Sequence, residues 1–431
     1  MLKKIKKKIF DLDRLIFKKF GSDKTLKFLE NIKEAHIIFS YLNNIGEEST
    51  VKFVGGCVRK SLSGETVDDI DLATTLSPGE VKEKLTKNKI KVLDTGIEHG
   101  TVTAIINNKK FEITTLRKDL STDGRHANVE FNKSWHDDSL RRDFTINAIY
   151  ADIEGRLFDP LNGVTDLKDG KVKFIGSPEK RIQEDYLRIL RYFRFFTQYS
   201  QAKHDHEVIR CIKRNINGIN KISNERIFEE LNKIFKLKNF YDIFFNKDSK
   251  EIFLNIFPSF KFYERLKILK KFNKNIKQKY DSTLILSLLI IDDSDSYEYF
   301  CHKYKTSNQV KKRFKIISKN YENLKSKKFY NREYIKKLIY SLNKKEHVVD
   351  LLLFSACINK KIKISDIEEL IKYIMDCKIP KFPISGEYLK QYGYVPGEAL
   401  GKKLKFLEEK WIQNNFIIDK NIIEKTLGKP K

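Results

Sequence analysis

The sequence is poor in cysteine, with only five among its 431 residues. These are Cys57, Cys211, Cys301, Cys357 and Cys377, and no two of them form a C-x-x-C pair. An odd and scattered set argues against a disulfide framework and against a zinc ribbon. It is typical of a chain kept in a reducing compartment, so we expect a cytoplasmic protein.

Long apolar runs are also missing. The longest, residues 284–291, is interrupted by Ser287. A transmembrane helix needs about 20 consecutive apolar residues. The sequence therefore predicts no membrane partner.

Arginine is scarce beside lysine, although the chain as a whole is strongly basic. Of the 85 basic residues 68 are Lys and 17 are Arg, and the net charge is +27. Thirteen of the arginines lie between Arg59 and Arg226, and only three follow. A chain this basic favours a polyanionic partner, foremost a nucleic acid. Because only Arg offers a planar, bidentate donor, residues 59–226 are where recognition geometry is expected.

The hydrophobic pattern divides the chain into a mixed N-terminal part and a long helical part. Between residues 51 and 160, short β runs alternate with turns, and we expect strands at 51–54, 70–75, 91–93, 101–106 and 110–116. Asn107-Asn108 predicts a tight hairpin turn, and Ser77-Pro78 opens a helix that runs to about Asn88. From about residue 178 apolar residues recur at helical spacing, apart from a cluster of Pro and Gly between 380 and 401. A basic amphipathic helix is expected near the N-terminus, with Ile5 and Phe20 on its apolar face.

Two short patterns in the first part indicate phosphate chemistry. Gly55-Gly56 follows a β run and precedes a helix, an arrangement that lets backbone N–H groups approach a phosphate. Asp69 and Asp71 are two residues apart on a strand, so both side chains point to one face. Adjacent carboxylates fit a pair of Mg²⁺ ions, and Glu112 on a neighbouring strand is the candidate third carboxylate. An isolated D-x-D fits a solvated strand edge equally well.

The motifs, taken together, resemble the class II nucleotidyltransferases, which comprise bacterial CCA-adding enzymes and poly(A) polymerases. Four ordered blocks carry the resemblance: Gly55-Gly-Cys-Val-Arg59 with Asp69-x-Asp71, Arg141-Arg-Asp-Phe-Thr-Ile-Asn-Ala148, Glu184-Asp-Tyr-Leu-Arg188, and residues 224–230. The resemblance implies an α+β fold, with a polymerase-beta-like head of mixed sheet and helices followed by an all-α neck, body and tail. It places these domains at residues 45–155 (head), 156–240 (neck) and 241–431 (body and tail), after a basic extension at 1–44.

The resemblance also implies a reaction and its residues. An RNA 3′-hydroxyl attacks the α-phosphate of a nucleoside triphosphate, and pyrophosphate leaves. Asp69 and Asp71 would hold Mg²⁺, with Glu112 as the third catalytic carboxylate. The implied nucleotide-binding residues are Gly55, Gly56, Arg59, Arg117, Asp143, Asn147, Asp185, Arg188 and Arg191.

Asp185 and Arg188 bear on which base is accepted. They are three residues apart, which on one helix makes them neighbours. Arg only donates and a carboxylate only accepts hydrogen bonds. Cytosine and adenine offer an amino donor beside a ring acceptor, whereas guanine and uracil carry a carbonyl in place of that amino group. The pair can therefore select C and A without a template; read alone, it fits an ordinary salt bridge better.

The leading interpretation is addition of C, C and A to tRNA, with CTP and ATP as substrates and the tRNA acceptor arm and 3′ end as partner. The alternatives are a poly(A) polymerase and a non-catalytic RNA-binding relative. Residues 95–102, 123–126 and 392–397 resemble CCA-adding enzymes more than poly(A) polymerases, and intact Asp69 and Asp71 argue against a non-catalytic relative. Lys60 departs from the family pattern, which has Asp there. The sequence does not give the oligomeric state.

One further pattern, His204-Asp205-His206, suggests a metal site at first sight. No cysteine or further histidine lies nearby in the sequence. We therefore predict a surface helix there.

Overall fold

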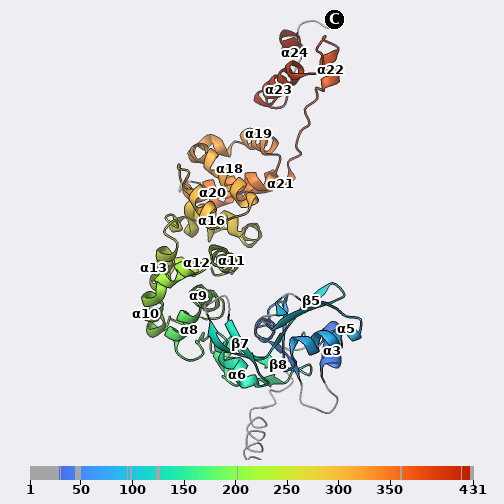
Figure 1. The fold of residues 1–431 in the computed structure, drawn as a ribbon. Helices are drawn as coiled ribbons and strands as arrows, with labels where there is room; N and C mark the ends of the chain where they lie inside the picture. Colours follow the sequence, from blue (N-terminus) through green and yellow to red (C-terminus); the bar gives the residue numbers. More distant parts are fainter. Residues whose placement is uncertain are drawn as a thin grey trace, which may run out of the picture. The chain divides into compact units, whose positions relative to one another are not determined.

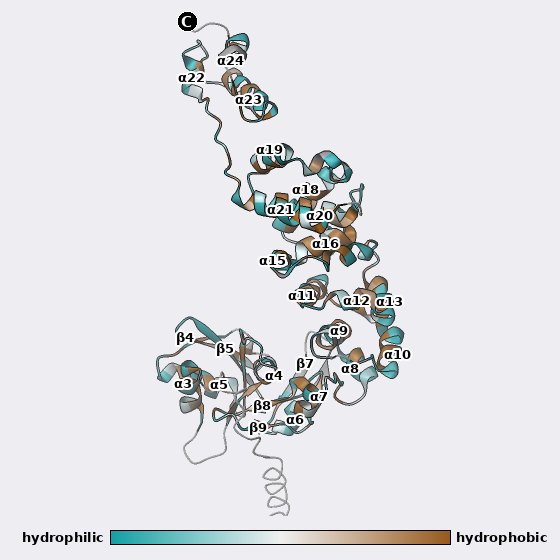
Figure 2. Cartoon of the chain, turned by 180° about the vertical axis from the view of Figure 1, so that it is seen from behind, coloured by the Kyte–Doolittle hydropathy of each residue, from teal (hydrophilic) through white to brown (hydrophobic). Residues whose placement is uncertain are grey.

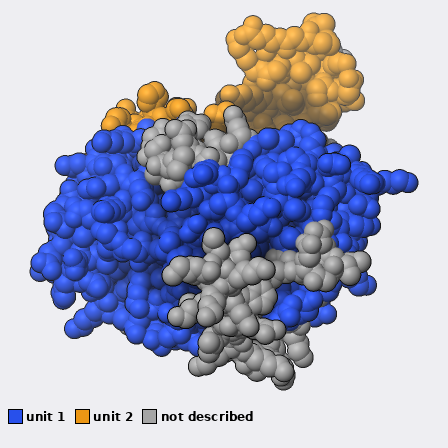
Figure 3. Space-filling view, turned by 60° about the horizontal axis from the view of Figure 1, so that its bottom comes forward, with its two compact units in different colours: residues 1–256 blue, residues 257–431 orange. Residues whose placement is uncertain are grey.

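The computed structural model describes residue 29 and residues 31–43, 50–94, 96–97, 100–122, 127–200, 202–359, 362–418 and 420–427. The chain divides into two compact units, residues 1–256 (unit 1) and 257–431 (unit 2), coloured separately in Figure 3. The expected helix around residues 5–20 and the segment 123–126 lie outside the described residues. None of the helices in the described ranges is long and apolar enough to cross a membrane.

Unit 1 is built on a seven-stranded mixed sheet (Figure 1) in the order β3-β4-β5-β2-β1-β8-β9. Its strands are β1 (Val51–Val54), β2 (Ile70–Thr74), β3 (Lys91–Leu93), β4 (Thr101–Ile106), β5 (Lys109–Thr115), β8 (Tyr150–Ala151) and β9 (Leu157–Phe158). β2 and β5 run parallel, while β1 pairs with β2 and β8 antiparallel. All five strands expected from the sequence are present.

Local sequence explains why these elements begin and end where they do. Asn107 and Asn108 have φ values of 50° and 64°, the left-handed backbone that a two-residue hairpin turn requires. Helix α5 (Pro78–Lys87) starts with a capping box, in which Ser77 accepts from Glu80 N and Glu80 accepts from Ser77 N. This box and Pro78 at the first helical position fix the start of α5.

Side chains alternate along each strand between the two faces of the sheet, and one of these faces forms the main core. Helices α3 (Lys33–Leu42) and α5 pack with α4 (Gly56–Leu62) on Phe53, Leu72, Phe111 and other residues of one sheet face. Asp71 lies between Ile70 and Leu72, and Glu112 between Phe111 and Ile113, so both carboxylates belong to the opposite face. The sheet thus directs the acidic residues away from its main core.

Residues 117–122 and 127–131, for which the sequence analysis predicted no strands, pair with each other. β6 (Arg117–Thr122) pairs antiparallel with β7 (Ala127–Phe131) in a separate two-stranded sheet. Three short elements follow: α6 (Trp135–Leu140), the 3₁₀ turn η2 (Thr145–Asn147) and α7 (Gly163–Lys168). A Cβ at Gly163 would lie 2.2 Å from Thr145 O, so only glycine allows α7 to approach η2 this closely.

The rest of unit 1 is helical, as predicted. Its elements are α8 (Pro178–Glu184), α9 (Arg188–Tyr199), α10 (His206–Asn215), the 3₁₀ helix η3 (Ile216–Lys221), α11 (Asn224–Phe235), α12 (Tyr241–Phe245) and α13 (Lys247–Ile256). Phe144 and Phe174 form an isolated β-bridge, and their rings pack with Tyr192 of α9. This aromatic cluster joins the segment after the sheet to the helices.

The prediction of a surface helix at His204 is wrong for that residue. His204 precedes α10 and is 8% exposed. Its Nδ1 lies 3.1 Å from Tyr192 Oη, and its Nε2 lies 2.8 Å from Ser249 Oγ. The ring stacks on Phe196. His204 is therefore a hydrogen-bonded core residue, whereas Asp205 caps α10 and His206 is exposed.

Unit 2 is entirely helical in the residues that the structure describes. Its elements are η4 (Tyr263–Arg265), α14 (Leu266–Leu269), α15 (Lys274–Lys277), α16 (Ser282–Ile290), α17 (Ser296–Lys303), α18 (Asn308–Lys325), η5 (Lys327–Tyr330), α19 (Arg332–Leu342), α20 (Lys345–Ile358), α21 (Ile364–Asp376), α22 (Gly386–Lys390), α23 (Glu398–Gln413) and α24 (Lys420–Leu427). α16 and α20 are buried along nearly their whole length and hydrophobic in character (Figure 2). A second small core joins α22, α23 and α24.

The turn-rich segment expected near the end of the chain lies before and after α22. The proposed domain limits at 155/156 and 240/241 stay predictions.

We predict that His204 makes unit 1 less stable in acid. Burial lowers the pKa of its imidazole, so protonation favours the unfolded chain, in which a histidine has a pKa of about 6.5. The contribution of His204 to stability is present above that pH and is lost as pH falls below it. Thermal denaturation of the wild-type and His204→Gln proteins at about pH 7.5 and about pH 5.5 measures the effect.

The destabilisation on acidification should be smaller in His204→Gln than in the wild type. His206→Gln is the matched control, because His206 is exposed, and it should lose as much stability as the wild type. An equal acid sensitivity of His204→Gln and the wild type would contradict the assignment.

Candidate active site

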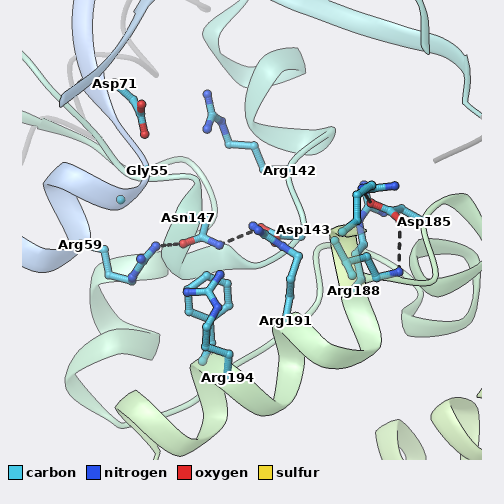
Figure 4. Close-up of a pocket in the computed structure, with 14 residues that line it drawn as sticks. Gly55, Arg59, Asp71, Arg142, Asp143, Asn147, Asp185, Arg188, Arg191 and Arg194 are labelled. Atoms are coloured by element: carbon cyan, nitrogen blue, oxygen red, sulfur yellow. Dashed lines mark hydrogen bonds and ion pairs between the residues drawn. The ribbon is translucent and has the colours of Figure 1, made fainter. Parts of the chain in front are cut away.

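One cleft of unit 1 gathers most of the predicted site residues. It has a volume of about 440 Å³, and Figure 4 shows Asp71 and Arg59 at one end and Asp185 and Arg188 at the other. Its lining residues are Gly55, Gly56, Arg59, Asp71, Arg142, Asp143, Asn147, Asp185, Leu187, Arg188, Arg191, Arg194, Phe195 and Arg226. Six arginines face three aspartates, so the cleft carries net positive charge and suits an anionic ligand.

The glycine end of the cleft is formed where β1 turns into α4. Gly55 has φ 68°, a conformation that a side chain disfavours. A Cβ there would lie 3.5 Å from Arg142 Nη1. Two residues hold the Arg142 guanidinium in place. Its Nε and Nη2 donate to Asp138 Oδ2 at 3.2 and 3.0 Å, and its Nε also donates to Tyr150 Oη at 3.1 Å. The guanidinium therefore has a fixed position beside Gly55.

A chain of hydrogen bonds crosses the floor of the cleft (Figure 4). Arg59 of α4 donates to Asn147 Oδ1 of η2. Asn147 Nδ2 donates to Asp143 Oδ1 at 2.8 Å, and Arg191 Nε of α9 donates to Asp143 Oδ2 at 2.7 Å. Burial would raise the pKa of the Asp143 carboxyl, but Arg191 and Asn147 outweigh it and hold that pKa well below its usual range. Asp143 is thus held in its ionised form, with Arg191 as its direct partner and Arg59 linked to it through Asn147.

The carboxylates on β2 and β5 form the acidic part of the site. Asp71 and Glu112 are register partners on the parallel strands, and Asp69 precedes Asp71 by two residues. Burial, followed by the negative charges of Glu112 and Asp69, raises the pKa of Asp71 to about 6. Among the described residues no three Asp, Glu, His or Cys side chains converge tightly enough to hold a metal as they stand. The carboxylates are oxygen donors that repel one another, and this donor set fits a hard divalent cation.

The structure changes the interpretation of Asp185 and Arg188. Asp185 ends α8 in an extended conformation and Arg188 begins α9, so they are not neighbours on one helix face. Asp185 Oδ2 accepts instead from Arg226 Nη2 at 2.8 Å. Arg188 donates to Glu184 and to Arg181 O. Both side chains nevertheless line the cleft.

Nine of the twelve predicted site residues line this cleft; Asp69, Glu112 and Arg117 do not. Their roles stay predictions. The sequence analysis missed five lining residues: Arg142, Leu187, Arg194, Phe195 and Arg226. The clustering of arginine between 59 and 226 was a signal for three of them, whereas Leu187 and Phe195 left none.

Lys60, the departure from the family pattern, faces away from this cleft. It lies on α4 beside Arg59, and its Nζ is 3.2 Å from Asp68 Oδ2 on the surface. Exposed ion pairs of this kind contribute little, about 0–1 kcal/mol. Lys60 itself is not among the residues that line the cleft.

Two segments of the sequence match known protein families. The "Poly A polymerase head domain" family matches residues 51–173. The family described as "Probable RNA and SrmB- binding site of polymerase A" matches residues 205–263. Both matched segments start within unit 1.

Full-length relatives and solved structures extend this match to nearly the whole chain. The mouse mitochondrial CCA tRNA nucleotidyltransferase 1 is 33% identical over 410 residues, which cover 91% of this chain and 89% of the relative. The CCA-adding enzyme of Ligilactobacillus salivarius is 30% identical, with 93% and 94% covered. The fold is that of the Bacillus stearothermophilus CCA-adding enzyme in complex with CTP, with a TM-score of 0.69, 22% identity and 91% and 94% covered. The chain belongs to the family of CCA-adding tRNA nucleotidyltransferases.

Proposed function

We propose that this chain adds C, C and A to the 3′ end of tRNA without a template, using CTP and ATP. The observation that carries the proposal is the cleft itself, where Asp71 on the sheet and the Asp185–Arg188 turn line one cavity rich in arginine. Relatives named CCA tRNA nucleotidyltransferase and CCA-adding enzyme span nearly the whole chain. Their names support CCA addition over poly(A) synthesis.

In the proposed reaction the terminal 3′-hydroxyl oxygen of the RNA bonds to the α-phosphorus. The bond from that phosphorus to the bridging oxygen breaks, pyrophosphate leaves with this oxygen, and the hydroxyl proton is released. The cleft supplies positioning and charge neutralisation, since nucleotidyl transfer needs no covalent intermediate with the protein. We assign the binding of the triphosphate to Gly55, Gly56 and Arg59, and contacts to the ribose and phosphates to Asp143 and Asn147.

Nucleotidyltransferases of this family are metal-dependent, and we assign Mg²⁺ as the ion. Asp69 and Asp71 would hold it, with Glu112 as the neighbouring carboxylate. When bound, Mg²⁺ would neutralise charge on the reacting phosphate and polarise the attacking oxygen. The raised pKa of Asp71 supports this assignment, because burial and the negative charges of Glu112 and Asp69 outweigh the opposing effect of Arg142 and Arg59.

Base choice falls to Asp185 and Arg188. Their side chains supply the acceptor and the donor that the edges of cytosine and adenine need, at the end of the cleft away from Asp71. In unit 2, Lys rather than Arg supplies most of the positive charge, which suits contacts to the tRNA backbone. The placement of the protein in the cytoplasm stays a prediction.

The first prediction tests the reaction. With tRNA that lacks its 3′ CCA, the wild type should incorporate C from CTP alone and complete CCA when ATP is added. Asp69→Ala or Asp71→Ala should each slow the addition of both C and A by at least about a hundredfold, with tRNA binding largely intact. Asp68→Ala is the matched control, since Asp68 is exposed and does not line the cleft, and it should stay near the wild type.

Poly(A) tails made from ATP alone would instead favour a poly(A) polymerase. Near-normal incorporation by Asp69→Ala or Asp71→Ala would show that these carboxylates are not the metal ligands.

A second prediction concerns base choice. Arg188→Ala and Asp185→Ala should each relax discrimination against UTP and GTP by roughly ten- to a hundredfold, the worth of a good base contact. Single-nucleotide incorporation with each of the four triphosphates measures this ratio. Arg214→Ala, an exposed arginine of α10, should keep the wild-type preference. Equal slowing with all four nucleotides would assign Asp185 and Arg188 a purely structural role.

A third prediction concerns the grip on tRNA. Each Lys–phosphate contact releases a counterion, so the logarithm of affinity should fall linearly with that of salt concentration, by about 0.7–0.9 per contact. Titrations of several CCA-lacking tRNAs between about 0.05 and about 0.2 M salt measure the slope. The slope should be steep and similar for all of them. If the affinity for tRNA did not depend on salt, the net charge of +27 would not serve to bind tRNA phosphates.

A further inference from the structure

The short turn between α8 and α9 presents both base-reading candidates to the cleft. Arg188 N donates to Asp185 O at 3.0 Å, which makes these two residues the first and fourth of a β-turn. Asp185 Oδ1 also accepts from Leu187 N at 3.1 Å. The distance between the Asp185 and Arg188 side chains is therefore set by how the two central residues, Tyr186 and Leu187, are held.

Both central residues of this turn are held within unit 1. Leu187 is buried, with 8% exposed. The Tyr186 ring lies against Gly218 in η3: a Cβ at Gly218 would lie 2.0 Å from Cε1, 2.1 Å from Cδ1 and 2.4 Å from Cζ of that ring. Real Cβ atoms do not approach other carbons so closely. Only glycine at position 218 leaves room for the ring where it lies.

Two basic residues, one at the end of η3 and one in α11, also contact this turn. Lys221, at the end of η3, has its Nζ 5.6 Å from the centroid of the Tyr186 ring, within cation–π distance. Arg226 of α11, five residues further on, donates to Asp185 at 2.8 Å. The η3–α11 segment thus contacts the turn at two residues, Tyr186 and Asp185.

We propose that Tyr186 and Gly218 are positioning residues that determine nucleotide selectivity. The proposal rests on the proposed function, because it assigns base choice to Asp185 and Arg188. A methyl group at position 218 displaces the Tyr186 ring and shifts the turn, so Asp185 and Arg188 lose their match to the base edge. Asp71 lies on β2, which this displacement does not touch, so chemistry on a bound nucleotide continues.

Gly218→Ala tests the proposal through selectivity and binding. The preference for CTP over UTP should fall by about tenfold in kcat/KM on CCA-lacking tRNA. The same ratio should fall in direct binding of CTP and UTP to the protein without RNA, while kcat at saturating CTP changes by less than about threefold. Gly79→Ala is the matched control, since a Cβ at Gly79 in α5 meets nothing within 4 Å, and it should match the wild type.

A double-mutant cycle separates the contact from general damage. Tyr186→Phe keeps the ring and should keep the wild-type selectivity. Tyr186→Ala removes the ring without adding an atom and should itself relax selectivity. Gly218→Ala should add nothing in the Tyr186→Ala background, where no ring remains to be displaced. Tyr186→Ala also keeps the proposal testable if Gly218→Ala does not fold.

Four results would overturn the proposal. A folded Gly218→Ala protein with the wild-type CTP/UTP ratio would mean that the ring moves aside freely. Equal losses with all four nucleotides would mean a structural role only, as would additive effects of Tyr186→Ala and Gly218→Ala. A wild type that adds C and A but binds CTP and UTP alike would refute base choice by this turn, whereas a wild type that selects CTP in binding but extends no tRNA would refute only the proposed reaction.

Discussion

The Asp143 carboxylate lies away from water and accepts hydrogen bonds from two elements that are distant in the sequence, Asn147 in η2 and Arg191 in α9. Leaving such a buried charge without its partner costs about 3–5 kcal/mol, so the two elements are tied together through it. Arg59 joins from α4 through Asn147. These hydrogen bonds all connect to the Asp143 carboxylate. They therefore fix the positions of the glycine turn after β1 and of the first turns of α9 beside the same cleft.

The two units use arginine differently. In unit 1 six arginines line the cleft. In unit 2 the three arginines all have partners within the unit: Arg265 donates to the carbonyls of Leu288 and Ile291, Arg313 pairs with Asp281 and Asp350, and Arg332 pairs with Glu369. The planar fork of Arg suits such fixed geometry, whereas Lys is a mobile point charge. Arginine with a fixed geometry thus lines the cleft in unit 1, whereas in unit 2 the arginines are used in internal contacts and Lys supplies most of the positive charge.

Sequence predicted most where the structure is local. The β patterns predicted the two strands that carry Asp71 and Glu112, and Ser77, Pro78 and the Asn107-Asn108 pair predicted a helix start and a turn. Prediction from the sequence failed where contacts with residues distant in the chain determine the local structure. The i, i+3 spacing of Asp185 and Arg188 suggested one helix, but these residues are the ends of a β-turn between α8 and α9. His204 looked like a surface residue because Tyr192 and Ser249, its partners, come from other helices.

The two buried helices of unit 2 have a consequence for how the chain is made. α16 is apolar on all sides, and most of its cover comes from α18 and α20. During synthesis α16 leaves the ribosome well before α20, so its apolar surface waits without its final neighbours until residue 358 has emerged. Exposed apolar surface of this kind promotes aggregation of nascent chains. Unit 2 therefore completes the cover of α16 only when α20 has been made, whereas the seven-stranded sheet of unit 1 is complete once β9 has been made.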